Sequence, residues 1–213
     1  MAAQLLPVLD HLSVLIFALT GALVASRAQL DPVGFVFFAA LTGVGGGTLR
    51  DVVLDRPVFW LDRPAILLIC VAAAALVFFT AHLLESRYRA LLWLDAAALA
   101  VAVPAGVGIA QDMGAGTVTV IAMGVMTGSF GGLMRDVVAN EVPLILKQGE
   151  LYITAAFGGA IAAETALALT GDRAIGLLLC AAVVLVLRAG SLQWGWRLPV
   201  YRPRPPKVGP PRH

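Results

Sequence analysis

Two arginine–aspartate pairs, Arg50-Asp51 and Arg135-Asp136, stand in stretches that are otherwise apolar. Each pair lies near the end of a glycine-rich phrase that occurs in two versions, TGVGGGTLRDVV from Thr42 and TGSFGGLMRDVV from Thr127. The two phrases are offset by 127 − 42 = 85 in sequence number, and eight of the twelve paired positions are identical. Ionisable groups in apolar segments point to function by default, for example on an ion path. The alternative role is structural, with each arginine pairing with an acid and locking neighbouring helices together.

The glycines before each pair can interrupt a helix, because consecutive glycines weaken it by about 1 kcal/mol each relative to alanine. Irregular backbone at membrane depth survives only where it lines a cavity or is buried in protein. We therefore expect both helices to be broken, with the freed carbonyls of residues 41–44 and nearby hydroxyls able to coordinate a cation. Close helix packing is the alternative use of such glycines. The candidate pathway residues are Thr42, Gly45, Gly46, Gly47, Ser129, Phe130, Gly131 and Gly132.

Three further positions are singled out by the same offset. Phe130 stands where the first phrase has Gly45, and its ring could form an apolar constriction of the kind that gates pores, or simply pack between helices. Asp10 and Asp95 are also related by this offset. They are either partners of helix N-termini or acids at pore mouths. We group them with the two Arg-Asp pairs as charged support for the pathway.

The composition is that of an integral membrane protein. Hydrophobic residues make up 60% of the 213 residues, only 13% are charged, and the mean hydropathy is +0.89, whereas about 25% of a soluble domain is charged. Cys70 and Cys180 lie in apolar runs and are interpreted as small core residues. The three histidines are too scattered for a metal cluster, and no nucleophile–base pair is evident. We expect no enzyme activity, no cofactor, no fixed metal and no nucleic-acid partner.

Seven segments are apolar over the roughly 20 residues that a membrane-spanning helix needs. An all-α bundle with short connections follows. The predicted spans are 8–26, 33–54, 64–83, 91–110, 116–138, 150–170 and 174–192.

The repeat assigns these spans to two units. Spans one to three correspond to spans four to six, and because three is an odd number, the second unit must enter the membrane upside down. We therefore predict an inverted three-plus-three repeat with an additional seventh helix. The predicted parts are residues 1–86, the first repeat; 87–171, the second; 172–194, the seventh span; and 195–213, a basic Pro-rich tail.

Seven spans place the chain ends on opposite sides of the membrane. With the tail in the cytoplasm, the inner side has more arginine and lysine than the outer side, as the positive-inside rule expects. The prediction is a multi-pass inner (plasma) membrane protein with its N-terminus outside and its C-terminus cytoplasmic. The cations assigned to the inner side are Arg27, Arg87, Arg89, Arg135, Lys147, Arg188 and the tail; those outside are Arg50, Arg56, Arg63 and Arg173.

The two phrases in a seven-span inverted repeat resemble prokaryotic members of the trimeric intracellular cation channel family, and the resemblance covers nearly the whole chain. It implies a homotrimer in which each subunit has its own pore beside kinked second and fifth helices, passing monovalent cations, chiefly potassium. Animal relatives hold an acidic lipid through a basic residue near the fifth-helix kink, where this chain reads Leu133-Met134-Arg135. The same bacterial group has also been labelled glycine transporter.

A secondary transporter of a small amino acid such as glycine is therefore the alternative, since inverted repeats and broken helices describe many transporters. The predicted spans lack a pair of carboxylates at mid-depth, as a coupling site would need, which favours a channel. The expected partners are potassium ions, membrane lipid and two further copies of the chain.

Overall fold

The computed structural model describes residues 2–84 and 86–201. Within this part of the chain, seven helices are long and apolar enough to cross a membrane, judged by length and composition. The predicted all-α architecture and all seven spans are confirmed. The helices are α1 (Ala2–Arg27), α2 (Pro32–Val53), α3 (Ala65–Thr80), α4 (Arg87–Asp112), α5 (Thr117–Val138), α6 (Ile153–Thr170) and α7 (Arg173–Trp194), with short 3₁₀ turns η1 (Ala81–Leu83) and η2 (Leu144–Leu146).

Local capping residues set several helix ends. The Asp31 side chain accepts a hydrogen bond of 2.8 Å from the Gly34 N–H, with Pro32 in the first helical position. Ser86 caps α4 in the same way, which starts that helix four residues before the predicted span. Gly171 and Gly195 end α6 and α7 at φ of 66° and 67°, the left-handed region that glycine enters without strain. Of the predicted tail, residues 202–213 lie outside the described part.

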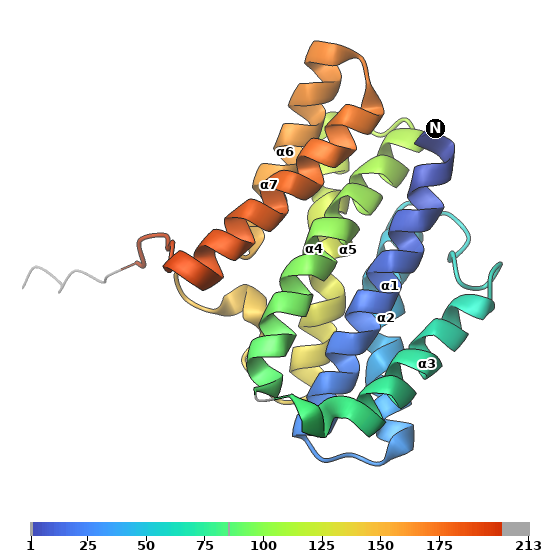
Figure 1. The fold of residues 1–213 in the computed structure, drawn as a ribbon. Coiled ribbons are helices and arrows are strands. Elements are labelled where there is room, and N and C mark those ends of the chain that lie inside the picture. Colours follow the sequence, from blue (N-terminus) through green and yellow to red (C-terminus); the bar gives the residue numbers. More distant parts are fainter. Residues whose placement is uncertain (1, 85, 202–213) are drawn as a thin grey trace, which may run out of the picture.

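Four helices, α1, α2, α4 and α5, form the centre of the bundle, with α3 packed on α1 and α2 and the α6–α7 pair packed on α4 and α5 (Figure 1). Helices α1 and α4 run in opposite directions (Figure 1). The buried apolar side chains form two main clusters, one mostly from α1–α3 and the other mostly from α4–α7. Both free cysteines are buried in these cores, as predicted.

The expected breaks at the glycines are not found. Helices α2 and α5 are each continuous through their glycine clusters, so no carbonyls are released there. The glycines serve a close backbone contact instead: a Cβ on Gly46 would collide with the Thr127 carbonyl oxygen, and one on Gly131 with that of Thr42. The repeat offset relates Gly46 to Gly131 and Thr42 to Thr127, so the same contact is made twice between α2 and α5.

A second pair of glycines makes the same kind of close backbone contact. Gly21 of α1 lies against the Phe38 carbonyl, and Gly106 of α4 lies against the Met123 carbonyl, again related by the repeat offset. Small residues at these crossings allow the helices to approach backbone to backbone, as is common in membranes. Close packing is therefore the role of the glycines that the structure supports.

Candidate functional site

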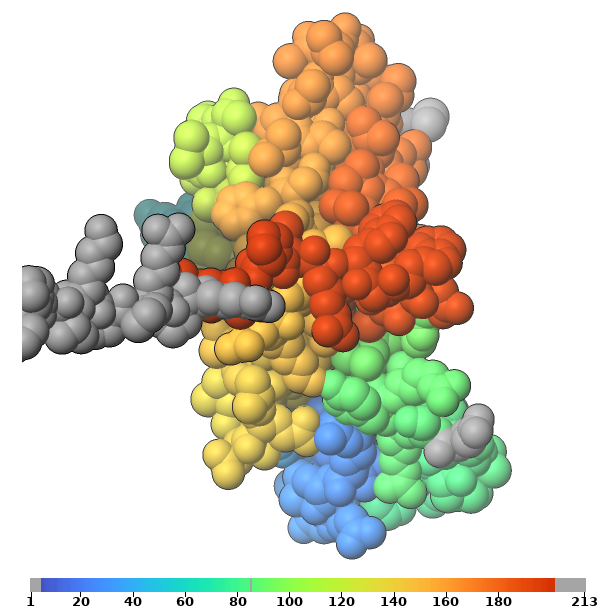
Figure 2. All heavy atoms as spheres, turned by 90° about the vertical axis from the view of Figure 1, so that its left-hand side faces the viewer, coloured from blue at the N-terminus to red at the C-terminus, as the bar shows by residue number. Residues whose placement is uncertain are grey.

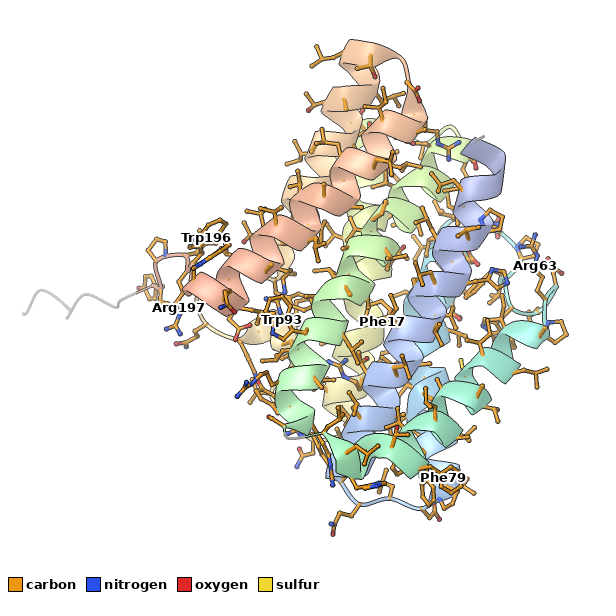
Figure 3. All side chains as sticks on the ribbon, viewed as in Figure 1. Phe17, Arg63, Phe79, Trp93, Trp196 and Arg197 are labelled. Atoms are coloured by element: carbon orange, nitrogen blue, oxygen red, sulfur yellow. The ribbon has the colours of Figure 1, made fainter. Side chains whose placement is uncertain are left out.

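A vestibule of about 270 Å³ opens between the first turns of α1, the end of α4 and the segment that joins α2 to α3. Side chains of both charges line it, and Arg63 projects from the α2–α3 segment at its edge (Figure 3). Its lining residues are Leu6, Pro7, Asp10, His11, Arg56, Pro57, Phe59, Asp62, Arg63, Ile66, Ile109 and Asp112.

The first charged cluster borders this vestibule through Asp10 and Arg56. Arg50 is fully buried and donates from Nη1 to Asp10 Oδ1 at 2.9 Å and from Nε to Asp51 Oδ1 at 2.8 Å. Asp51 also accepts the Phe59 backbone N–H at 2.9 Å, and Arg56 lies 3.6 Å from it. Asp10 retains 13% side-chain exposure. The arginine is therefore shared by two carboxylates, one of which faces the vestibule.

A smaller cavity of about 10 Å³ lies deeper in the bundle and also has Asp10 and Phe59 in its wall. That volume is close to the minimum that one water molecule needs. Phe17 of α1 is part of its wall. The remaining lining residues are Ser13, Val14, Gly43, Gly46, Gly47, Ala102 and Thr127. Asp10 and Phe59 thus form the border between the vestibule and a cavity at the α2–α5 contact.

The second charged cluster repeats the first at the same offset. Arg135 donates from Nη1 to Asp95 Oδ1 at 3.0 Å and from Nε to Asp136 Oδ1 at 2.7 Å. Asp136 accepts the Leu144 backbone N–H at 2.9 Å, as Asp51 accepts that of Phe59. Arg135 has one extra partner, the Thr20 hydroxyl of α1 at 2.9 Å.

This second cluster is sealed. Arg135 and Asp95 are both completely buried, and Tyr152 beside them is 2% exposed. The space over the Gly132 Cα is ringed by Asp95, the Tyr152 hydroxyl and Arg135.

The predicted pathway residues are not gathered in one place. The hydroxyls of Thr42 and Ser129 donate to carbonyls of their own helices, those of Phe38 and Val125. Gly45 is covered by the Met134 side chain. Only Gly46 and Gly47 of the predicted set line the inner cavity. Thr42, Gly45, Ser129, Phe130, Gly131 and Gly132 line neither of the two cavities, and Phe130 is partly buried.

The interpretation of Asp10 and Asp95 as helix N-terminal partners is wrong. Helix α1 begins at Ala2 and α4 at Arg87, so each aspartate lies two turns into its helix and pairs with an arginine of the next helix in its repeat. The pore-mouth alternative fits Asp10, which faces the vestibule, whereas Asp95 faces no open space.

Sequence reasoning also counted three buried arginines as if they lay at the membrane surface. Arg50, Arg135 and Arg188 are fully buried in helices, whereas the positive-inside rule counts residues in loops and near span ends. The inner side then keeps Arg27, Arg87, Arg89, Lys147 and Arg197 in the described chain, against Arg56, Arg63 and Arg173 outside. The orientation therefore stays a prediction, and it now depends on fewer cations than the sequence analysis counted.

Several residues of these sites were not singled out as site residues from the sequence. Phe17 and Phe59 give no signal among many apolar residues, and Tyr152 lies near the start of the predicted span 150–170 without any motif. Arg188 did carry a signal, because a charged residue inside the apolar seventh span is a functional hypothesis by default.

Comparison with known proteins agrees with this architecture. A family model described as "Glycine transporter" matches residues 7–82 and 92–168, segments that each include most of three consecutive helices. The UPF0126 inner membrane protein YadS of Escherichia coli (strain K12) is 36% identical over 203 residues, covering 91% of this chain and 94% of the relative.

Solved structures are similar over almost the whole fold. The TRIC trimeric intracellular cation channel orthologue from Rhodobacter sphaeroides superposes with a TM-score of 0.86 and 48% identity, covering 89% of this chain and 98% of that one. A structure described as showing the structural basis for conductance through TRIC cation channels gives a TM-score of 0.82 with 25% identity, covering 93% and 98%. The chain belongs to the glycine transporter sequence family, and with it to the prokaryotic members of the trimeric intracellular cation channel family.

Proposed function

We propose that each subunit conducts monovalent cations, chiefly potassium, through a path that enters at the vestibule and passes Asp10 and Phe59 into the cavity between α2 and α5. The observation that carries this proposal is that Asp10 and Phe59 belong to both cavities. An acid at the border between a wet vestibule and a buried cavity would attract a cation and stabilise it as it loses part of its hydration shell.

The charge balance of the first cluster supports cation entry. Arg50 is held by two carboxylates, Asp10 and Asp51, so the three groups together carry a surplus negative charge. Arg56 offsets part of it from a position that is 31% exposed and 3.6 Å from Asp51, where water screens its charge. A cation in the vestibule therefore meets the Asp10 carboxylate, whose charge Arg50 neutralises only in part.

The described conformation is closed in this scheme. A cavity of about 10 Å³ leaves no continuous aqueous path. Beyond it, α2 and α5 meet backbone to backbone at Gly46 and Gly131. Conduction requires this contact to widen, and the glycines put the helix backbones themselves, rather than side chains, at the closure.

The family resemblance also supports a proposal for the assembly and the membrane orientation of the chain. We expect a homotrimer with one pore per subunit, in the inner membrane, with the N-terminus outside and the C-terminus cytoplasmic. The division into repeats 1–86 and 87–171, the seventh span 172–194 and the tail 195–213 is supported by the contacts that recur at the repeat offset.

Transport of a small zwitterion such as glycine is the second candidate. The observation that favours it is the mixed charge of the vestibule, where Asp10 and Asp62 could bind an ammonium group and Arg56 and Arg63 a carboxylate. In a carrier, the two sides of the path open alternately around such a site.

Purified protein in a planar bilayer under asymmetric KCl separates the two. Unitary current steps that reverse near the potassium equilibrium potential are the expected result. Saturable uptake of labelled glycine into proteoliposomes without current steps would replace the channel by a carrier. Membranes formed with detergent alone, and protein carrying Asp10→Asn, serve as controls.

A further inference from the structure

Arg188 of α7 is a buried cation with few partners. Its side chain is fully buried, and the one ion pair it makes within residues 2–84 and 86–201 is a long contact from Nη1 to Glu150 Oε2 at 3.5 Å. Among the residues that the structure describes, Nε and Nη2 have no hydrogen-bond partner. A buried charge that is incompletely paired destabilises the fold. Packing alone gives no reason for an arginine at this position.

Arg188 also contacts the ring of Tyr152. The guanidinium carbon lies 4.8 Å from the ring centre, within range of a cation–π interaction. On its other side, Tyr152 reaches the sealed cluster: a Cβ built on Gly132 would lie 3.4 Å from the Tyr152 hydroxyl and 3.3 Å from Asp95 Oδ1. The tyrosine therefore stands between Arg188 and the second charged cluster.

The first repeat lacks this arrangement. The position that matches Tyr152 at the repeat offset is Leu67, which lines neither cavity, and α7 has no counterpart in the first repeat. There the matching acid, Asp10, faces the vestibule. Tyr152 and Arg188 thus occur only on the side where the acid is sealed.

The acid that pairs with Arg188, Glu150, lies at the surface near the end of α7. Glu150 is 26% exposed and belongs to a segment that pairs with the chain after α7: Leu198 N–H donates to the Gly149 carbonyl at 3.0 Å. Figure 2 shows the end of α7 and the residues after it crossing this face of the molecule, and Figure 3 places Trp196 and Arg197 there. A movement of this segment would displace Glu150 and release Arg188.

We propose that Arg188 is a positioning residue that holds Tyr152 across the second cluster. Release of Tyr152 opens a second vestibule next to Asp95, on the side of the membrane where α7 ends. This inference rests on the proposed function for its effect on current, but the opening itself is a structural event that can be observed without current.

Four variants test the assignment. Arg188→Met replaces the guanidinium by an apolar side chain of similar length and so removes the charge. Arg188→Lys keeps a positive charge at this position. Glu150→Gln removes the exposed partner and is less prone to disturb folding. Arg89→Met removes an exposed arginine at the first turn of α4 and is the matched control.

Two readouts are taken from each variant. Single-channel recording separates open probability from unitary conductance. In a background with Cys70→Ala and Cys180→Ala, Thr20→Cys places a thiol beside Arg135, and its reaction with a charged thiol reagent is measured from each side of the membrane.

We expect Arg188→Met and Glu150→Gln to raise open probability about three- to tenfold, the effect of losing one cation–π or ionic contact, with unitary conductance unchanged. Both should speed labelling of Thr20→Cys from the side where α7 ends, and not from the other. Arg188→Lys should return both values toward wild type. A merely structural arginine would lower protein yield without a side-specific change in labelling.

The outcomes separate this inference from the channel itself. If wild type gives no current but Arg188→Met still speeds labelling from that one side, the positioning role stands and the channel proposal fails. If wild type conducts, and neither Arg188→Met nor Glu150→Gln changes open probability or labelling relative to Arg89→Met, the positioning role is wrong.

Discussion

The two charged clusters make the same arginine–carboxylate bonds, yet only one borders a cavity. Arg50 binds Asp10 and Asp51 as Arg135 binds Asp95 and Asp136, with matching atoms and nearly equal distances: 2.9 against 3.0 Å and 2.8 against 2.7 Å. The sequence repeat accounts for this geometry, because its offset relates Asp10 to Asp95 as well as the two Arg-Asp pairs. It does not account for the 13% exposure of Asp10 against complete burial of Asp95.

The difference comes from what lies above each cluster. Next to the first cluster, the segment that joins α2 to α3 does not fill the space, and the vestibule remains there with Phe59 in its wall. Over the second, Leu144 and Tyr152 are buried in the apolar core of α4–α7. The same motif therefore borders a cavity in one repeat and is sealed in the other, and the neighbouring segments decide which.

The largest effect is expected at the crossing that joins the two halves. Gly46→Ala and Gly131→Ala each place a methyl group against a carbonyl of the partner helix. Backbone cannot move aside as a side chain can, so we expect each variant to lose about 3 kcal/mol or more of stability and much of its folded protein. The measurement is thermal unfolding in detergent together with the folded fraction after size-exclusion chromatography.

Gly116→Ala is the matched control, because a Cβ there has no neighbour within 4 Å. It should leave the unfolding midpoint unchanged. Normal stability of both Gly46→Ala and Gly131→Ala would mean that α2 and α5 do not touch as described, and the equivalence of the two repeats at this crossing would be lost.

A smaller effect distinguishes the two acids. Asp95→Asn leaves a fully buried arginine short of charge, and breaking such a pair costs about 3 kcal/mol. Asp10→Asn does the same beside a vestibule that water enters, so about 1 kcal/mol is expected. Unfolding midpoints of the two variants should therefore differ clearly, with Asp95→Asn the less stable. Equal losses would show that both clusters are equally hydrated, contrary to the difference in exposure between Asp10 and Asp95.

Much of this architecture was accessible from the sequence, for identifiable reasons. Apolar length predicts the seven helices, and the repeated phrase gives the offset that relates Asp10 to Asp95. The helix breaks were predicted wrongly because glycine's low helix propensity was given more weight than its ability to bring two helices into contact. At a tight crossing the packing gain outweighs the local loss, so Gly46 and Gly131 remain helical.

The site itself was less accessible. Whether an acid faces water or core depends on segments that share no motif, such as the loop containing Phe59 and the residues before α6. Arg188 could have been noted as a charge inside the seventh span, but its contact with Tyr152 joins two distant positions that no periodicity links. Tertiary neighbours of this kind cannot be inferred from one sequence.

The third prediction concerns current through the first cluster. A unit charge about 4 Å from an ion is worth about 1 kcal/mol in water, equivalent to about a fivefold change, so Asp10→Asn should lower cation conductance by up to that factor at low salt. At about 1 M salt the Debye length falls to about 3 Å, and the difference should shrink. Asp55→Asn is the control: Asp55 is exposed outside the vestibule with φ of 51°, and the equivalent residue of the second repeat, at φ of 55°, is Asn140. Conductance unaffected by Asp10→Asn at low salt would remove the vestibule from the path.

The smallest effect is expected from the vestibule arginines. Arg56 is 31% exposed and Arg63 is exposed at the rim, so their charges are screened by water and salt and each is worth less than about 1 kcal/mol to a passing ion. Arg56→Gln and Arg63→Gln should therefore raise cation conductance by less than about twofold in dilute KCl, opposite in sign to Asp10→Asn, and change nothing at high salt. The same variants sharpen the choice of function, because a glycine carrier needs a cation for the substrate carboxylate and would lose uptake in one of them. Single-channel conductance and glycine uptake, measured on the same preparations, give opposite signs for the two mechanisms. A fall in conductance with Arg56→Gln would mean that Arg56 acts mainly by stabilising the first charged cluster through Asp51, and less by repelling the passing cation.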